Sequence, residues 1–370
     1  MSATPTNRAA WMLSPKQRLQ VDEAPYSTPK SDEIIIKNRA IAINPIDWVV
    51  QEQGTALAFG WIKYPYIFGC DVAGSVVSIG SAVTRFKIGD RVVGQALSTV
   101  PKIGTAAHGG FQLYPTLLEQ NTVRVPDNVG FEEACAMPLG LATAAAGLFE
   151  KEQLGLGYPS LSPKPTGKTL LVWGGSTSVG LNAIQLGVAT GYEVIATSSP
   201  KNFKLLKSLG AREVFDYNDA RVVEKIVSAM KERISAGAIA MGENSAVRCL
   251  DVLSRCQGDR RIAMATFPIP QNPGRFALLK IILALLKAVF TIFVRSKLRG
   301  IKLSIVFGSI WNSPVGDAVY GDFLPEALAS GKFQILPEPV VVGEGLESVQ
   351  AGMEMQKKGV SAKKIVVALK

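Results

Sequence analysis

The sequence is poor in the residues that bind metals and form disulfides: its 370 residues include one histidine and four cysteines. The cysteines, at positions 70, 135, 249 and 256, are far apart and form no Cys-x-x-Cys pair. A disulfide framework is therefore not expected, and a reducing intracellular compartment fits this pattern better. Residues 1–10 lack the apolar core of a signal peptide, so we expect a cytoplasmic protein.

Acidic residues are also few, 30 against 40 basic ones, which gives a net charge of +10. Much of the excess lies between Arg275 and Lys302, where seven residues are basic and none is acidic. No basic stripe interleaved with aromatic residues occurs elsewhere, so nucleic acid is not an expected partner. The length suffices for two domains with buried cores, and the composition is ordinary for a globular α/β protein.

The most informative stretch is a glycine turn. An apolar run at residues 170–173 breaks at Gly174-Gly175, and a second apolar run follows at residues 192–196. A strand, a glycine turn, a helix and a strand in this order bind the pyrophosphate of a dinucleotide, although a purely structural turn is the alternative. The glycines permit a tight turn and close packing of the helix on the strand. The candidate cofactor contacts in this turn are Gly174, Gly175, Ser176, Thr177, Ser178, Val179 and Gly180.

The end of the second apolar run indicates which nicotinamide cofactor binds. A site that prefers NADH carries Asp or Glu about 20 residues after the glycines, where it binds the ribose 2′-hydroxyl. Residues 197–202, Thr-Ser-Ser-Pro-Lys-Asn, contain no acid. Hydroxyl groups and a lysine suit the 2′-phosphate of NADPH, and Ser199 before Pro200 is also a typical helix start. The candidate contacts here are Ser198, Ser199, Lys201 and Asn202.

Two patterns of expected elements divide the chain. A strand at 31–43 and shorter ones with glycine turns predict a small irregular β-barrel; the shorter ones are 72–79, 91–93 and 111–114. After an Ala-rich helix at 131–148, strands alternate with helices, which predicts a doubly wound parallel sheet. There we expect helices at 203–209 and 221–234 and strands at 213–215, 246–253 and 261–267. An extended segment at 333–342 and a last strand at 364–369 would return to the first domain.

Residues 276–294 are strongly apolar and would extend over ~28 Å as a helix. Four polar residues fall on one narrow helical stripe: Lys280, Lys287, Thr291 and Arg295. A membrane span would bury two lysines and interrupt the parallel sheet, which argues against it. The remaining interpretations are a buried helix that walls a substrate pocket or a subunit interface, and a peripheral helix that contacts a membrane or admits a lipophilic substrate.

Together with the glycine turn, several motifs resemble the medium-chain dehydrogenase/reductase superfamily over nearly the whole chain. They are Asn44-Pro45-Ile46-Asp47-Trp48 and the segments 68–74, 86–92, 110–114 and 359–367. The resemblance implies an α/β protein with a GroES-like irregular β-barrel domain and a Rossmann domain built on a doubly wound parallel sheet. The domain boundaries would be 1–136 with 317–370 for the first and 137–316 for the second, with an apolar insertion at 275–300.

The motifs are similar to those of fungal zinc-independent members, such as trans-acting enoyl reductases of polyketide pathways and zinc-type alcohol dehydrogenase-like proteins. Catalytic zinc takes three protein ligands, usually Cys, His or a carboxylate. Where zinc-dependent members have Cys, Gly-His-Glu and Cys, this chain has Asn44, Gly69-Cys70-Asp71 and Leu139. Their four-cysteine structural zinc lobe is also missing, so no zinc is expected. The one histidine, His108, is interpreted as a solvated turn residue or, alternatively, a substrate contact.

The resemblance also implies residues near the cofactor and the chemistry. Asn44 and Pro45 would contact the cofactor, and Tyr217 would lie beside the 2′-phosphate or be an ordinary loop tyrosine. Backbone groups near Phe267 and Phe307-Gly308 would hold the nicotinamide carboxamide, while both aromatic rings could equally pack in core strands. Thr143 would lie beside the nicotinamide or bond to its own helix. The candidate catalytic residues are Thr143, Asp47 and Cys70, with Asp71 and Tyr66 as further proton relays and water as another proton source.

These expectations describe an NADPH-dependent, zinc-independent reductase of an activated C=C bond, enoyl or enone, in a hydrophobic substrate of secondary metabolism. Without a metal, such an enzyme depends on the alignment of the nicotinamide with the acceptor carbon. A polyketide synthase is a candidate partner, and the chain would be a monomer or a homodimer joined near residues 303–310. The alternatives are a quinone or carbonyl reductase and, in another class, a non-redox isomerase or ligand-binding protein. Related reductases often have Lys where this chain has Val49, which favours the non-redox class, whereas the intact glycine turn argues against it.

Overall fold

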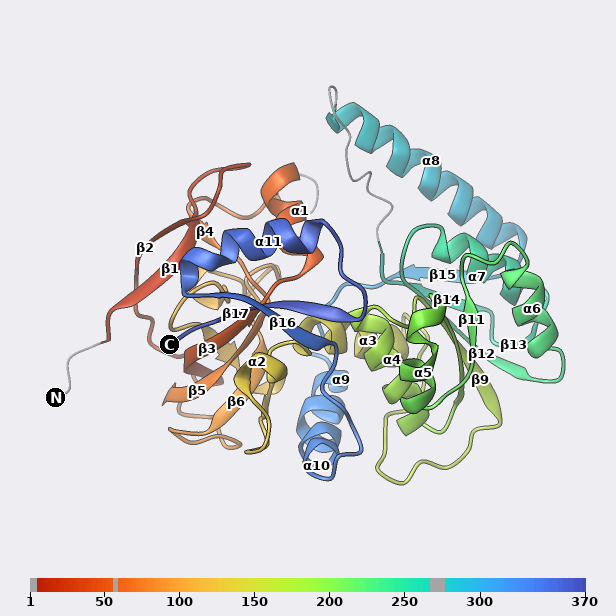
Figure 1. The fold of residues 1–370 in the computed structure, drawn as a ribbon, viewed down its shortest axis with the longest axis horizontal. Coiled ribbons are helices and arrows are strands. Elements are labelled where there is room, and N and C mark those ends of the chain that lie inside the picture. Colours follow the sequence, from red (N-terminus) through yellow and green to blue (C-terminus); the bar gives the residue numbers. More distant parts are fainter. Residues whose placement is uncertain (1–4, 56–58, 267–276) are drawn as a thin grey trace. The chain divides into compact units, whose positions relative to one another are not determined.

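The computed structural model describes residues 5–55, 59–266 and 277–370 (Figure 1). The chain divides into two compact units: unit 1 comprises Met1–Ala142 and Ser309–Lys370, and unit 2 comprises Thr143–Gly308. These divisions fall a few residues from the domain boundaries expected at 136 and 317. The α/β class is confirmed, with a mainly antiparallel sheet in unit 1 and a parallel sheet in unit 2.

Unit 2 has the strand order β11-β10-β9-β12-β14-β15, with the short β13 beside β12. Every pair in this sheet is parallel, and the strand order reverses between β9 and β12, the switch point where such sheets bind ligands. Its strands are β9 (Lys168–Trp173), β10 (Glu193–Ser198), β11 (Ala211–Asp216), β12 (Ile234–Ala240), β13 (Gln257–Gly258), β14 (Arg261–Met264) and β15 (Lys302–Ile305). Its helices are α4 (Ser178–Ala189), α5 (Phe203–Ser208), α6 (Val222–Ala229), α7 (Ser245–Leu253) and α8 (Ala277–Leu298), preceded by α3 (Pro138–Phe149). The predicted doubly wound sheet is therefore confirmed.

The prediction for residues 234–253 was wrong. The expected strand at 246–253 is the helix α7, and β12 occupies residues that we assigned to the end of a helix and a linker. The buried residues of α7, Ala246, Cys249, Leu250 and Leu253, recur every three or four positions, the period of a helix with one buried face. The sequence of β12, Ile-Ser-Ala-Gly-Ala-Ile-Ala, has low strand propensity, and burial between two neighbouring strands determines its conformation instead.

Unit 1 contains a sheet in the order β16-β17-β3-β5-β6-β8, with β7 beside β3, and a smaller sheet in the order β2-β1-β4. The strands are β1 (Asn7–Met12), β2 (Gln20–Ala24), β3 (Glu33–Ala42), β4 (Tyr66–Ile67), β5 (Asp71–Ile79), β6 (Arg91–Gln95), β7 (Thr116–Leu118), β8 (Thr122–Arg124), β16 (Glu338–Glu344) and β17 (Lys363–Ala368). The helices are α1 (Pro45–Gln53), α2 (Phe131–Ala134), α9 (Pro314–Gly316), α10 (Leu324–Ala329) and α11 (Val349–Lys357). β17 pairs with β3, so the last strand lies in the same compact unit as the first strands of the chain.

The strand predicted at 111–114 is wrong. This segment forms one isolated bridge, between Ala9 and Gln112, and β7 follows it. The buried side chain of Gln112 binds the preceding turn, since its Nε2 donates to the carbonyl oxygens of Ala106, Ala107 and Gly109 at 2.9, 3.1 and 2.7 Å. The backbone of 111–114 bonds to different parts of the chain instead of one strand: the Leu113 N–H donates to the Arg8 carbonyl, and the Phe111 N–H donates to the Phe68 carbonyl.

The apolar segment forms the helix that the sequence predicts, α8. Its buried Ile292 joins the core of unit 2, which includes Leu171, Ile195 and Leu250. Within the described parts of the chain, we find no helix that combines the length and the apolar character needed to pass through a bilayer.

Candidate functional site

The glycine turn lies at the carboxyl end of β9, where α4 begins. Gly174 has a φ of +84°, and a Cβ atom on it would lie 2.6 Å from the carbonyl oxygen of Met241. A Cβ atom on Gly180 would lie 2.3 Å from the carbonyl oxygen of Gly174, so α4 packs directly on the turn. Both positions therefore exclude a side chain.

The start of α4 presents groups that suit an anion. Thr177 caps the helix: its Oγ1 accepts from the Gly180 N–H at 3.0 Å and donates to the Gly174 carbonyl at 2.8 Å. The Oγ of Ser178 is buried and has no hydrogen-bond partner in the part of the chain that the structure describes. Ser176 and Val179, in the same turn, are half-buried. An orphaned hydroxyl beside the first N–H groups of a helix fits phosphate oxygens, so the turn fits a dinucleotide.

A threonine that we did not predict holds this turn in place. The Thr197 Oγ1 accepts from the Gly174 N–H at 3.0 Å, and its carbonyl accepts from the Gly175 N–H at 2.7 Å. Thr266, after β14, makes a similar hydrogen bond to another glycine, because its Oγ1 accepts from the Gly242 N–H at 2.9 Å. A threonine near the carboxyl end of a strand is the only sequence signal for this role, and it is a weak one.

The end of β10 separates the predicted 2′-phosphate contacts into two groups. Ser199 and Tyr217 come together, with 3.1 Å between their hydroxyl oxygens, and Lys201 is exposed two residues further on. Ser198 and Asn202 are buried, and the Ser198 hydroxyl donates to a backbone carbonyl. Ser199, Lys201 and Tyr217 therefore remain accessible to a ligand.

The remaining candidates of unit 2 lie at other points of the fold. Phe307, just after β15, is 72 % exposed, so the expectation that its ring packs in the core is wrong; Gly308 follows it and is half-buried. Phe267 lies outside the described residues. Thr143 is buried in α3.

Unit 1 contains a buried polar cluster built from distant parts of the sequence. The Lys364 Nζ donates to Asn44 Oδ1 at 2.6 Å and to Asp71 Oδ2 at 2.7 Å. Asp71 also accepts from Asn44 Nδ2 at 2.9 Å and from the Leu139 N–H at 2.7 Å. Asp47 joins the cluster through Oδ2, which accepts from the Asn44 N–H at 2.7 Å at the start of α1. The lysine–carboxylate pair is almost completely buried, with side chains 5 % and 0 % exposed.

Burial controls the protonation of the two candidate catalytic residues in this cluster. Burial, reinforced by the negative charge of Asp71, raises the pKa of Asp47 to about 7, although the Asn44 N–H and Lys364 act against this shift. Burial, together with Asp47 and Asp71, raises the pKa of the Cys70 thiol well above its usual value. Asp47 can therefore hold a proton near neutral pH, and Cys70 remains a thiol.

Of the residues in and beside this cluster, Asn44, Asp47, Cys70 and Asp71 were predicted from the sequence, whereas Lys364 was not. Asn44, Asp47 and Asp71 are joined by hydrogen bonds, whereas Pro45 is exposed at the first turn of α1. Tyr66 donates to the Ser98 carbonyl at 2.7 Å instead. A lysine at the start of an apolar strand looks like an ordinary exposed residue, so no sequence signal could have identified Lys364.

These residues do not fit a catalytic zinc site. Zinc needs three deprotonated or neutral ligands, whereas the corresponding positions hold the Asn44 amide, the protonated Cys70 and the side chain of Leu139. The Lys364 ammonium already bonds to Asn44 and Asp71, and its positive charge opposes a second cation. Across the described residues, no three His, Cys, Asp or Glu side chains are grouped so that they could hold a metal ion.

His108 is not solvated, contrary to the first of its two interpretations. It is 3 % exposed, and its Nε2 lies 3.1 Å from the Glu33 Oε1, while its Nδ1 lies 2.9 Å from the Thr105 Oγ1. Burial lowers the pKa of His108, against the opposing effect of Glu33. The interpretation as a solvated turn residue is therefore wrong, and His108 has a structural partner.

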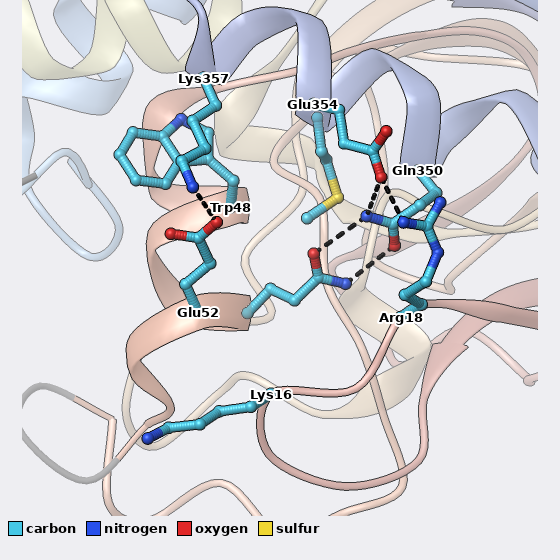
Figure 2. A pocket seen from close by; sticks show the side chains of 9 residues that line it. Lys16, Arg18, Trp48, Glu52, Gln350, Glu354 and Lys357 are labelled. Carbon is cyan, nitrogen blue, oxygen red and sulfur yellow. Dashed lines mark hydrogen bonds and ion pairs between the residues drawn. The ribbon is translucent and has the colours of Figure 1, made fainter. Parts of the chain in front are cut away.

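A groove of about 210 Å³ lies between α1 and α11 in unit 1 (Figure 2). Its polar side chains bind one another: Gln51 and Gln350 exchange two hydrogen bonds of 2.9 and 3.1 Å, and Lys357 pairs with Glu52. Arg18 pairs with Glu354 at 2.5 Å. The side chains that line the groove therefore hold α1, α11 and the segment with Arg18 together.

Comparisons with known proteins agree with these features. Residues 30–127 match the model of the alcohol dehydrogenase GroES-like domain. Dehydrogenase pigH of Monascus ruber is 48 % identical over 369 residues, which cover 99 % of this chain and 100 % of the relative. Trans-enoyl reductase himH of Aspergillus japonicus is 39 % identical, and the match covers 98 % of this chain and 97 % of the relative.

Solved structures show the same fold at low sequence identity. An NAD-dependent alcohol dehydrogenase superposes with a TM-score of 0.71 at 22 % identity, covering 98 % of this chain and 100 % of its own. The CurK enoyl reductase superposes with a TM-score of 0.69 at 18 % identity, covering 98 % of this chain and 99 % of its own.

Proposed function

This chain belongs to the medium-chain dehydrogenase/reductase superfamily of oxidoreductases, which use a nicotinamide cofactor, and from this premise we propose a specific reaction. The protein is an NADPH-dependent reductase of an activated C=C bond in a hydrophobic enoyl or enone substrate, and it works without zinc. The relatives named trans-enoyl reductases support the reaction class. A polyketide synthase that carries the acyl chain is the partner that best matches such a substrate.

The observation that carries the proposal is the fit of unit 2 to a dinucleotide. Bound NADPH supplies the hydride for the β-carbon of the alkene. The chain supplies the position: the glycine turn admits the pyrophosphate, and the buried hydroxyl of Ser178 with the first N–H groups of α4 binds its oxygens. Ser199, Lys201 and Tyr217 offer two hydroxyls and a cation to the 2′-phosphate, with no acidic side chain in residues 197–202 to repel it.

Unit 1 supplies candidates for the proton step. Reduction leaves an enolate whose α-carbon must be protonated, and Asp47 can hold that proton on its carboxyl group at neutral pH because of its raised pKa. Cys70 of unit 1 and Thr143 of unit 2 remain the other catalytic candidates, and water is a further proton source. Asn44 and Asp71 position Asp47 through the hydrogen bonds of the buried cluster.

A binding and turnover experiment tests the proposal. The purified protein is titrated with NADPH and NADH, followed by nicotinamide fluorescence, and then assayed with enones, enoyl thioesters, quinones and simple carbonyls after treatment with a chelator. We expect NADPH to bind at least about tenfold more tightly, a difference of about 1.4 kcal/mol. We also expect deuterium from the labelled cofactor at the β-carbon of the enoyl product.

Other outcomes would redirect or refute the proposal. Turnover of quinones or carbonyls alone would replace the alkene by those acceptors. Loss of activity with the chelator, restored by zinc, would overturn the zinc-free mechanism. Binding of neither cofactor would refute the reductase and favour a non-redox isomerase or ligand-binding protein.

A further inference from the structure

Helix α8 presents a row of large apolar side chains to solvent. Five of them are between 37 and 81 % exposed: Leu283, Leu286, Phe290, Val294 and Leu298. Their spacing of three or four residues places them along one side of the helix. We call these five residues the α8 stripe.

The opposite side of α8 attaches the helix to unit 2. Ile292 and Ser296, which lie across the helix from Phe290 and Val294, are 8 and 2 % exposed. Figure 1 shows α8 as a long helix that extends from the region of α7 and β15. The outward stripe is therefore not the face that the core of unit 2 needs.

An exposed apolar row of this extent marks an interaction surface. From Leu283 to Leu298 it extends ~23 Å along the helix axis. The stripe stands on a single convex helix, so a protein partner would need a matching groove. A lipid surface needs no such groove, because acyl chains and headgroups rearrange around a helix that lies between them.

Charge indicates which surface fits. Residues 275–302 contain seven basic residues and no acidic one. Arg295 and Lys297 are exposed next to the stripe, and no ion pair engages either of them within the described residues. Two copies of this helix packed against each other would bring cations together, whereas anionic headgroups would attract them.

We propose that α8 docks the protein on an anionic membrane surface, with the α8 stripe in the interface and the exposed Arg295 and Lys297 at the headgroups. The helix lies along the membrane plane. The proposal is independent of the reaction proposed above, although a bilayer would also concentrate a hydrophobic substrate near the protein.

Flotation with vesicles tests this surface without cofactor or substrate. The full chain is mixed with phosphatidylcholine vesicles that contain about 30 % phosphatidylserine, and with pure phosphatidylcholine vesicles. We expect binding to the anionic vesicles that falls severalfold in about 0.5 M salt and on the neutral vesicles. The double substitution Leu286→Ser with Phe290→Ser should reduce binding about tenfold or more. The matched control Ile88→Ser changes a side chain 65 % exposed in unit 1 and should bind like the parent.

Charge variants and an oligomer measurement complete the test. Arg295→Glu with Lys297→Glu should weaken binding about tenfold, whereas Lys231→Glu on another exposed turn should not. Leu298→Ser, at the helix end, gives a second stripe variant, and unchanged thermal melts show that all variants fold. If the parent fails to float, or the stripe variants float like the parent, the proposal is wrong. A parent dimer that the stripe variants dissociate, without vesicle binding, would assign the stripe to a second copy instead.

Discussion

Replacement of Lys364 by methionine is the sharpest test of the buried cluster in unit 1. The change keeps the length of the side chain but removes the ammonium that bonds to Asn44 and Asp71. Loss of one partner of a buried ion pair costs about 3–5 kcal/mol, because the other charge stays buried. Asp71 keeps hydrogen bonds from Asn44 and the Leu139 N–H, so we expect a loss at the lower end, about 3 kcal/mol.

Urea unfolding followed by tryptophan fluorescence measures this loss. With a slope of about 2 kcal/mol/M, the midpoint should fall by about 1.5 M. The neighbour Lys363 gives a matched control, since it pairs with Glu338 at the surface, and Lys363→Met should change the free energy of unfolding by less than about 1 kcal/mol. Adding Asp71→Asn to Lys364→Met should cost less than the sum of the two changes. Equal effects of the two lysine substitutions, or strict additivity of the pair, would refute the cluster as described.

Three further predictions concern the proposed site. Burial raises the pKa of Asp47 to about 7, whereas the unfolded chain has about 4. The stabilisation from its protonated form, about 4 kcal/mol, is therefore present below about pH 4 and lost as the pH rises through 7. Asp47→Asn should remove this pH dependence of urea unfolding, and an unchanged pH profile would contradict it. Gly180→Ala should destabilise unit 2 by about 1–3 kcal/mol and weaken NADPH binding at least tenfold, since the new Cβ has no space. The control Gly321→Ala, whose new Cβ would have no neighbour within 4 Å, should change neither stability in thermal melts nor NADPH binding in calorimetric titrations. Lys201→Ala should weaken NADPH binding about tenfold and leave NADH binding unchanged, whereas the control Lys207→Ala should change neither. Equal weakening of the binding of both cofactors by Lys201→Ala would argue against a 2′-phosphate contact.

The parts of the fold that depend on neighbouring residues could be predicted. The turn at Gly174 and Gly180 carries a local signal, because Gly174 has a φ of +84° and a Cβ on Gly180 would meet the Gly174 carbonyl in the same turn. The alternation of strands and helices in unit 2 was predicted because the pattern of apolar residues is also a local signal. Residues 234–253 were misassigned because the burial of β12, not its composition, makes it a strand.

The polar contacts of the site could be predicted only in part, because they join residues far apart in sequence. Lys364 and Asp71 are 293 positions apart, and His108 and Glu33 are 75 apart. A lysine or a histidine in one sequence gives no indication of the strand register that will bury it. The motif around Asn44 identified the place, but the charge that stabilises it comes from the other end of the chain.

The pairing of β17 with β3 has a consequence for how the protein forms during synthesis. The strand that completes the sheet of unit 1, residues 363–368, leaves the ribosome after unit 2 and after the other strands of its own sheet. Until then residues 40–42 of β3 lack a neighbour on one edge, and Asp71 lacks its lysine. Unit 2 consists of residues 143–308 and can become compact while the first 142 residues still lack the later part of unit 1. A nascent chain of this protein therefore exposes part of this strand edge while unit 2 is being made, and the later synthesis of β17 closes it.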